Sequence, residues 1–338
     1  MQPKFLIRPI KQDDLKEILE LAEKTGPGMT SLPADLKLLG DKIQNSVNSF
    51  KIEPAKPGDE SYRFVLEDLE KKQLVGIAAI TARIGGYEAF YSYEIKKARH
   101  VSEKLGVDKE VEYLELKKEH DGPSLIGSLF LDPEYRGSGL GKILSQARFF
   151  FMANFPKRFA ESIIAEMRGV IDKDAQSPFW NGTVRNFFDM DFTKADYLSI
   201  TDKGFIADLM PKYPLYIPLM REATQAAIGK VHEKTKPALD FLLSEGFKPD
   251  GHVDIFDAGP RIEAKISDIK TIKESKTVKL KAIVKTLADD LETYLISNTA
   301  IDFRFTKAKL LIEADGVSME EGTAKLLNLE LGSELRYL

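Results

Sequence analysis

The sequence predicts an α/β protein in which helices flank a mixed, largely antiparallel sheet. Over residues 1–262, segments with a helical spacing of apolar residues alternate with short apolar segments rich in β-forming residues, which is typical of that class. After about Arg261 the pattern changes to short β-forming segments separated by acidic or glycine turns. We therefore expect a domain over 1–262 and a small β-rich C-terminal module over 263–338. Similar helix endings at residues 188–192 and 245–247 raise the alternative that a second, related half begins at about residue 200.

The chain is predicted to open with a strand and two helices. Residues 5–9 favour a strand, and a stripe of apolar residues predicts a helix over 11–24 that ends at Gly26-Pro27-Gly28. A second stripe predicts a helix over 34–50.

An antiparallel pair of strands should follow these helices. Residues 62–69 and 74–84 are β-forming and flank the charged turn 70–72. Signals are weaker over residues 85–122, where we expect an insertion of mixed structure.

The clearest local pattern comes after the insertion. Residues 124–131 form a strongly apolar run that ends at Asp132-Pro133, and a glycine turn then leads into an amphipathic segment over 140–155. Beyond it, composition predicts a strand over 163–167, helices over 178–190 and 237–244, and a strand over 253–256. Within the C-terminal module the predicted strands cover 278–284, 293–296, 303–312 and 335–338.

Composition excludes several classes of function. The 338 residues contain no cysteine, which rules out disulfides, thiolate catalysis and cysteine-ligated zinc and favours the cytoplasm. No run of about 18 apolar residues occurs, so we expect neither a membrane span nor secretion. The net charge is −4, with lysines interleaved among acidic residues, so nucleic acid is not an expected partner. A core of this size needs neither a metal nor a permanently bound cofactor for stability.

The glycine turn carries the chemical signal. Arg136-Gly137-Ser138-Gly139-Leu140-Gly141 stands where a buried strand passes into a helix, so backbone N–H groups and the helix amino terminus converge on one point that favours an anion, pyrophosphate above all. A P-loop would need Ser or Thr after Gly141-Lys142 and a different first glycine. A dinucleotide fold would need Gly-x-Gly-x-x-Gly on the first strand. Both alternatives fit the spacing less well.

The strand and turn, residues 129–142, closely resemble the acyl-coenzyme A site of the GNAT superfamily of N-acyltransferases. The order of predicted elements also resembles that fold. The resemblance implies that Arg136, Gly137, Ser138, Gly139 and Gly141 cradle the pyrophosphate. On the same reading the strand splays from its neighbour, pantetheine adds to its open edge, and a backbone N–H near Leu129 or Phe130, with Leu131 close by, points at the thioester carbonyl.

Longer blocks resemble one family within this superfamily, the arginine N-succinyltransferases. They include Ala165-Glu166-Met167-Arg168-Gly169 and Phe205-Ile206-Ala207-Asp208-Leu209-Met210-Pro211, with further blocks at 24–33, 129–133, 170–172, 177–180, 187–192 and 253–260. Ala258 stands where the family pattern has glycine, and the C-terminal module resembles the family only loosely.

The resemblance implies transfer of succinyl from succinyl-CoA to the α-amine of L-arginine. It implies that His232 is the catalytic proton donor and that Leu129 contacts the acyl-coenzyme A. Taken alone, His232 is a loop histidine near a helix start, and His100 and His120 are unassigned polar residues within the insertion. Succinyl-CoA is then a co-substrate, and L-arginine is the other small-molecule partner.

Four further residues are candidates for substrate binding. Thr30 and Ser31 lie in the loop between the first two helices, where they either contact the amino acid or cap the second helix. Glu166 and Arg168 alternate on a buried strand, where they either bind charged substrate groups or pair with each other. Trp180 is expected in the core.

Two other functions remain as alternatives. One is a GNAT acetyltransferase that acts on another small amine or on lysine. The other is a non-catalytic acyl-CoA-binding subunit or sensor, since members of this family can occur as paired related chains. The same pairing leads us to expect a homo-oligomer or a hetero-oligomer with a related chain.

Overall fold

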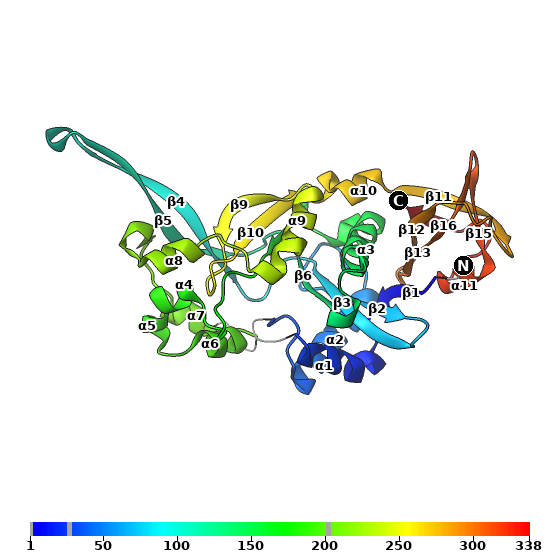
Figure 1. Cartoon of the computed structure of the whole chain (residues 1–338), viewed down its shortest axis with the longest axis horizontal. Coiled ribbons are helices and arrows are strands. Elements are labelled where there is room, and N and C mark those ends of the chain that lie inside the picture. The colour runs from blue at the N-terminus through cyan, green and yellow to red at the C-terminus, as the bar shows by residue number, and fades with distance from the viewer. Residues whose placement is uncertain (1–2, 26–28, 201–203) are drawn as a thin grey trace.

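The computed structural model describes residues 3–25, 29–200 and 204–338. Its strands join into one mixed sheet that runs along the whole molecule (Figure 1). The strands are β1 (Phe5–Pro9), β2 (Ser61–Asp68), β3 (Gln73–Thr81), β4 (Phe90–Ser102), β5 (Val107–Glu119), β6 (Ser124–Leu131), β7 (Ser162–Glu166), β8 (Leu215–Tyr216), β9 (Lys248–Val253), β10 (Pro260–Lys265), β11 (Lys276–Val284), β12 (Thr293–Asn298), β13 (Phe305–Lys309), β14 (Leu311–Glu313), β15 (Gly316–Glu320) and β16 (Glu334–Tyr337).

The order of strands is β14-β15-β11-β16-β12-β13-β1-β2-β3-β6-β7-β10-β9-β4-β5-β8. Within the described residues, β6–β7 and β11–β15 are the parallel pairs and the other pairs are antiparallel. The predicted α/β class with a largely antiparallel sheet and a β-rich C-terminal region is therefore confirmed.

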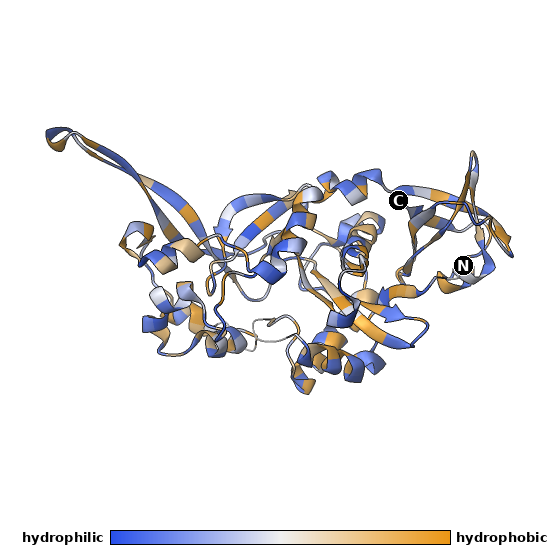
Figure 2. Cartoon of the chain, viewed as in Figure 1, coloured by the Kyte–Doolittle hydropathy of each residue, from blue (hydrophilic) through white to orange (hydrophobic). Residues whose placement is uncertain are grey.

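Helices cover both faces of the middle of the sheet. On one face lie α1 (Leu15–Glu23) and α2 (Leu36–Lys51), and on the other lie α3 (Leu140–Asn154) and α9 (Lys236–Ser244) (Figure 1). Each helix buries the apolar stripe that predicted it, and Figure 2 shows apolar residues concentrated on the strands between them. The side chain of Asp35 starts α2 by accepting a hydrogen bond from the Leu38 N–H at 2.8 Å.

A second core lies beside the base of the β4–β5 hairpin. It gathers apolar residues of β4, β5 and β9 with those of short helices. These helices are α4 (Pro178–Gly182), α5 (Arg185–Phe188), α6 (Phe192–Leu198), α7 (Gly204–Leu209) and α8 (Glu222–Ala227), while α10 (Lys270–Glu274) and α11 (Glu321–Leu326) lie further along the chain.

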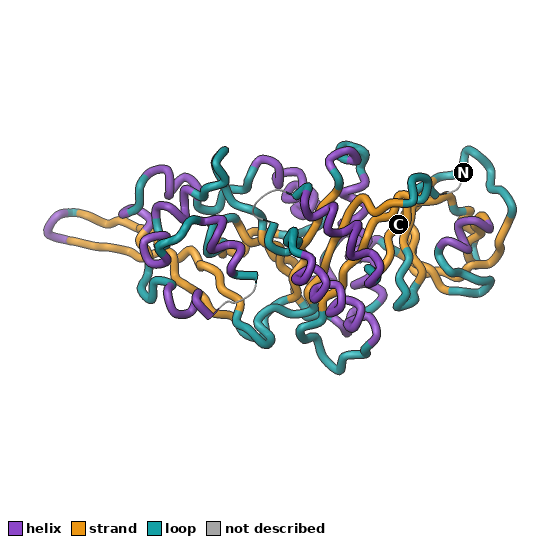
Figure 3. The backbone as a smooth tube through the Cα atoms, turned by 90° about the horizontal axis from the view of Figure 1, so that it is seen from below, coloured by secondary structure: helices purple, strands orange, loops and turns teal. Residues whose placement is uncertain are grey.

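The expected insertion over 85–122 is one long antiparallel hairpin, β4–β5, which projects from the body of the molecule (Figures 1 and 3). Its outer part is solvent-exposed on both faces and carries ion pairs across the strands, such as Arg99 with Asp108 and Lys97 with Glu110. A ribbon without a buried face needs no apolar alternation, so its sequence gave little strand signal.

Two other expected elements differ from the structure. The helix expected over 178–190 is divided into α4 and α5, because Thr183 has non-helical backbone angles of φ −130° and ψ −90°. The strand expected over 253–256 is wrong: β9 ends at Val253, since Asp254 turns the chain by accepting the N–H groups of Phe256 and Asp257. The expected helix end at 26–28 lies outside the described residues.

The C-terminal strands continue the main sheet. Ile7 of β1 pairs with Phe305 of β13, and Phe305 and Phe303 belong to the same core as α3. Both described ends of the chain lie near this region (Figure 3). The expected boundary after residue 262 falls inside β10, which pairs with both β7 and β9. No helix in the described part of the chain has the length and apolar character needed to cross a membrane.

Candidate active site

The predicted glycine turn, residues 136–141, connects β6 with α3. Gly137 and Gly139 have φ values of +77° and +82°, a conformation that suits glycine. A Cβ atom at either position would meet no atom within 4 Å, so the space beside the turn is open. Gly139 is the N-cap of α3 and supplies no capping side chain. The first turn of a fifteen-residue helix thus faces open space, the arrangement that binds phosphate groups.

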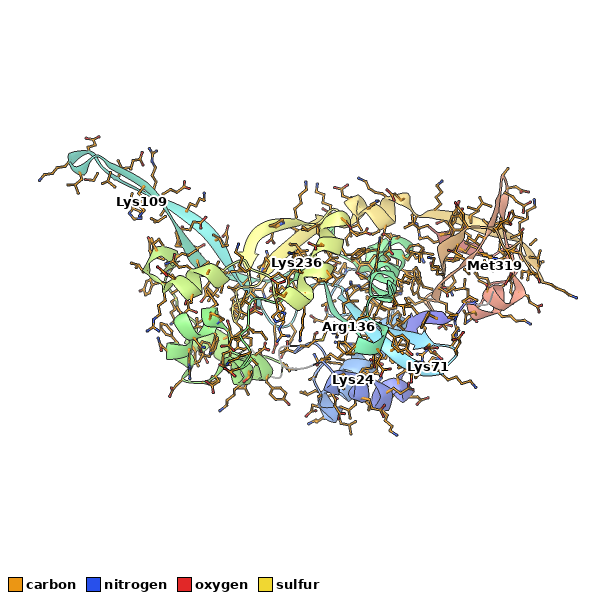
Figure 4. The ribbon with its side chains drawn as sticks, viewed as in Figure 1. Lys24, Lys71, Lys109, Arg136, Lys236 and Met319 are labelled. Atoms are coloured by element: carbon orange, nitrogen blue, oxygen red, sulfur yellow. The ribbon has the colours of Figure 1, made fainter. Side chains whose placement is uncertain are left out.

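Arg136 and its neighbours hold this turn against β6. The Arg136 Nε donates to the Leu131 carbonyl at 3.3 Å, and the guanidinium lies 5.7 Å from the ring centroid of Phe130. Ser138, also predicted, donates from its hydroxyl to the Tyr135 carbonyl at 2.5 Å. Arg136 is labelled at the centre of the molecule in Figure 4.

An ion pair ties the end of α1 to the same place. Lys24 Nζ lies 2.6 Å from Asp132 Oδ2, and Asp132 Oδ1 accepts the Glu134 N–H at 3.0 Å. Burial alone would raise the pKa of Asp132, but the bonds from Lys24 and Glu134 hold that pKa below its ordinary value. The end of α1 is therefore anchored beside the glycine turn (Figure 4).

β6 diverges from its parallel neighbour just before the turn. The described pairs between β6 and β7 end at Leu125–Ile164, whereas β7 pairs with β10 on its other side along its whole length. On its other side, Ile77 pairs with Phe130 and Ala79 with Gly127, so β6 has one extra residue there. This bulge places Ser128 at φ +51°. The backbone of Leu129 to Leu131 consequently borders the opening between the two strands.

His232 belongs to the β7 side of that opening. Its N–H donates to the Arg168 carbonyl at 2.8 Å, and Val231 forms a bridge with Gly169 directly beyond β7. His232 Nδ1 accepts the Lys234 N–H at 3.1 Å, so the neutral ring carries its proton on Nε2. Burial, followed by the charges of Arg168 and Lys234, lowers the pKa of His232 below the ordinary value near 6.5.

The predicted substrate residues lie on both sides of the opening. Thr30 and Ser31 follow α1, and the Ser31 carbonyl lies 3.5 Å from the Ser128 hydroxyl at the bulge. Neither caps α2, because Asp35 does. Glu166 is the last residue of β7, and Arg168 stands two residues further on.

A cluster of carboxylates near Arg168, in which Asp257 is buried and Asp196 and Asp254 are half-buried, was not predicted. Asp257 accepts the N–H groups of Gly169 and Gly259, each at 2.8 Å, and so joins the end of β7 to the start of β10. Burial, with the nearby Asp254, raises the pKa of Asp196 to about 7. Burial lowers the pKa of Arg168, while Asp257 and Asp196 oppose that shift. The sequence offered only scattered aspartates as a signal.

Other side chains singled out by their type take structural places. Trp180 is fully buried in the second core and donates from Nε1 to the Met190 carbonyl at 3.0 Å, as expected of a core residue. His100 lies in β4 and His120 follows β5, both in the expected insertion. Among residues 3–25, 29–200 and 204–338, no group of three or more His, Asp or Glu side chains is placed to hold a metal ion.

The mixed sheet, the divergence of β6 from β7, the bulge and the glycine turn before α3 define the GNAT class of N-acyltransferases. Comparison with known families narrows the class. The sequence model of the arginine N-succinyltransferase beta subunit family matches residues 5–271. The sequence model of the C-terminal domain of that subunit matches residues 276–338. The chain belongs to the arginine N-succinyltransferase family.

Individual relatives are similar to this chain over almost its whole length. The arginine N-succinyltransferase subunit beta of Pseudomonas aeruginosa is 42% identical, over 98% of this chain and 97% of the relative. The arginine N-succinyltransferase of Yersinia enterocolitica is 39% identical, over 98% and 96%. The solved structure of arginine/ornithine succinyltransferase subunit AI from Pseudomonas aeruginosa matches with a TM-score of 0.89 and 34% identity, over 99% of this chain and 98% of that one.

Proposed function

We propose that this chain transfers the succinyl group of succinyl-CoA to the α-amine of L-arginine, giving N2-succinylarginine and CoA. One observation carries the proposal: β6, which leads into the open glycine turn, diverges from β7, whose extension pairs with the segment of His232. A donor thioester and an acceptor amine can meet in such an opening. The names of the relatives supply the identity of the two substrates.

In this proposal the donor lies along β6. Its pyrophosphate occupies the turn of Arg136, Gly137, Ser138, Gly139 and Gly141, and pantetheine follows the open edge of the strand. A backbone N–H near Leu129 or Phe130, with Leu131 beside it, donates a hydrogen bond to the thioester oxygen. Such a donor stabilises the oxyanion by roughly 2.7 to 4 kcal/mol in comparable sites.

The reaction is a direct attack without an enzyme-bound intermediate. The α-nitrogen forms a bond to the thioester carbon, the carbon–sulfur bond breaks, the amine loses a proton and the thiolate gains one. We assign this proton transfer to His232: the ring takes up the proton that the amine loses, and the resulting imidazolium donates a proton from Nε2–H to the thiolate, which leaves the ring neutral again. In the structure Nδ1 accepts the Lys234 N–H, so Nε2 carries the proton of the neutral ring. This role is typically worth about 10² to 10⁴ in rate.

The acceptor lies on the other side of the thioester. The Ser31 carbonyl lies 3.5 Å from the Ser128 hydroxyl at the bulge, and the hydroxyls of Thr30 and Ser31 suit the polar groups of an amino acid. Glu166 and Arg168 stand at the end of β7, where a carboxylate suits the guanidinium of arginine and a guanidinium suits a carboxylate.

The proposal includes assembly and location. Relatives are named as subunits, and the β4–β5 hairpin exposes Val101 and Leu105 at its tip by 61% and 76%. We assign this hairpin to contact with a second or related chain. The cysteine-free composition supports the cytoplasm as the location.

Thiol release tests the reaction. The purified chain is supplied with succinyl-CoA or acetyl-CoA and with L-arginine, L-ornithine or L-lysine, and the products are weighed by mass spectrometry. We expect turnover to depend on succinyl-CoA and arginine and to yield arginine plus one succinyl group. A preference for acetyl-CoA would favour the acetyltransferase alternative. Tight CoA binding without turnover under any pair would favour a non-catalytic subunit.

A further inference from the structure

Two buried arginines meet the β6 bulge from opposite faces of the sheet. Arg63 of β2 is 7% exposed, and its Nη1 lies 3.3 Å from the Ser128 hydroxyl. Arg148 of α3 is 2% exposed, and its Nη1 lies 3.4 Å from the Gly127 carbonyl. The two guanidinium groups therefore contact consecutive residues of the strand that borders the proposed donor site.

Strand pairing explains how Arg63 reaches the bulge. Arg63 pairs with Ala79 on β3, and Ala79 pairs with Gly127 on β6, so the three residues project from the same face. Alanine and glycine leave room for the long side chain to cross both strands. A Cβ atom at Gly127 would meet nothing within 4 Å, so open space lies beside this end of the row.

Neutral groups are the partners of both arginines in the described part of the chain. Arg63 Nη1 also lies 3.4 Å from the Ser31 carbonyl, while its buried Nε has no partner. Arg148 donates to the carbonyl and hydroxyl of Ser145 at 3.4 and 2.5 Å. Burial lowers the pKa of Arg63 to about 10 and that of Arg148 to about 9, with no opposing carboxylate.

Two other arginines, the partly buried Arg8 and the buried Arg261, have carboxylate partners. Arg8 pairs with Asp14 and Glu67 at 2.8 and 2.9 Å, and Arg261 pairs with Asp250 and Glu119. A buried charge without a counter-ion is costly. Two such charges at one bulge, next to open space, indicate a site whose counter-ion comes with a ligand.

We propose that Arg63 and Arg148 bind the free carboxylate of a substrate at the β6 bulge. The inference rests on the proposed succinyl transfer, which offers two sources: the terminal carboxylate of the succinyl group and the α-carboxylate of arginine. The bulge immediately precedes Leu129, where the proposed thioester lies, so the succinyl group extends from there toward the guanidinium groups. Planar guanidinium groups suit a carboxylate, and an acetyl group has none to offer.

The test compares Arg63→Gln and Arg148→Gln with a matched control. Arg336→Gln is the control, because Arg336 is also a partly buried arginine with neutral partners, Asn154 and Ser275, but belongs to β16. The donor arm measures kcat/KM for succinyl-CoA and for acetyl-CoA. The acceptor arm measures it for L-arginine and for agmatine, its decarboxylated analogue.

We expect each site variant to lose about 10- to 100-fold in kcat/KM for succinyl-CoA, the loss of a charge-assisted hydrogen bond, with acetyl-CoA nearly unaffected. A loss confined to arginine over agmatine would assign the site to the acceptor carboxylate instead. The proposal would be overturned if folded site variants kept the parental ratios of kcat/KM for succinyl-CoA over acetyl-CoA and for L-arginine over agmatine, as Arg336→Gln should.

Direct binding separates this proposal from the proposed function. Calorimetry compares succinyl-CoA with CoA, which lacks the carboxylate, and needs no turnover. The parent should bind succinyl-CoA more tightly and the site variants should lose that difference, even if the parent fails to acylate arginine. If the variants do not fold, the ligand-induced rise in the Tm of the parent is measured instead. The site would be refuted if succinyl-CoA raised the Tm no more than acetyl-CoA and L-arginine raised it no more than agmatine.

Discussion

The glycine turn can be tested by adding a branched side chain at Gly139. Its φ is +82°, so Gly139→Val forces valine into a left-handed conformation at a cost of roughly 1–3 kcal/mol in unfolding free energy. A Cβ atom there meets no protein atom within 4 Å. Steric conflict should therefore arise with the ligand rather than with the fold. Losing one hydrogen bond to a charged phosphate costs roughly 1.5–3 kcal/mol, or about 10- to 150-fold in Kd.

Gly332→Val is the matched control for this change. Gly332 has a φ of +84° and equally open surroundings, but it lies in the C-terminal region between α11 and β16. Both variants should lose similar stability in thermal unfolding. Calorimetry with CoA should then show weaker binding for Gly139→Val and parental binding for Gly332→Val. Equal CoA affinity in the two folded variants would remove the turn from the proposed donor site.

Of four other predictions, two concern the histidine, one the C-terminal strands and one the hairpin. His232→Ala should lower kcat by about 10² to 10⁴ with CoA affinity unchanged. The control His100→Ala, on the hairpin, should keep the kcat of the parent. Parental kinetics in both variants would show that His232 has no catalytic role. NMR should place the pKa of His232 below 6.5, and Arg168→Gln should raise it, because burial and the Arg168 charge both favour the neutral ring; an unchanged value would exclude Arg168 as a cause. Phe303→Ala should lower the unfolding free energy by about 3–5 kcal/mol, since that ring is fully buried against Phe64 and Phe151. Denaturant titration measures this change. A change below about 1 kcal/mol would mean that the C-terminal strands do not complete the core. Replacing residues 99–108 by a short turn should keep the Tm and reduce the mass measured by light scattering; an unchanged mass would place the assembly contact elsewhere.

Local patterns predicted the elements that carry the proposed donor site. The spacing of apolar residues is set within a few turns of helix or a few residues of strand, so β6 and α3 were placed almost to the residue. The charged β4–β5 hairpin was not predicted, because a hairpin without a buried face needs no alternation of apolar and polar residues. Asp254 shows a further limit, since its side-chain bonds end β9 where the apolar residues of 253–256 suggested a strand.

The sequence by itself determined the family, through residues 136–141 and the longer blocks, because these patterns are read along the chain. Only the tertiary structure decided which distant residues meet. Arg63 stands between Tyr62 and Phe64, and no local sequence pattern predicts that its side chain crosses Ala79 and Gly127 to reach the β6 bulge. That meeting depends on the register of three strands and on one extra residue in β6, and Arg148 reaches the same bulge from α3 only because that helix packs on the opposite face. Register and packing arise from burial across the whole core, so they become visible only once the chain is folded.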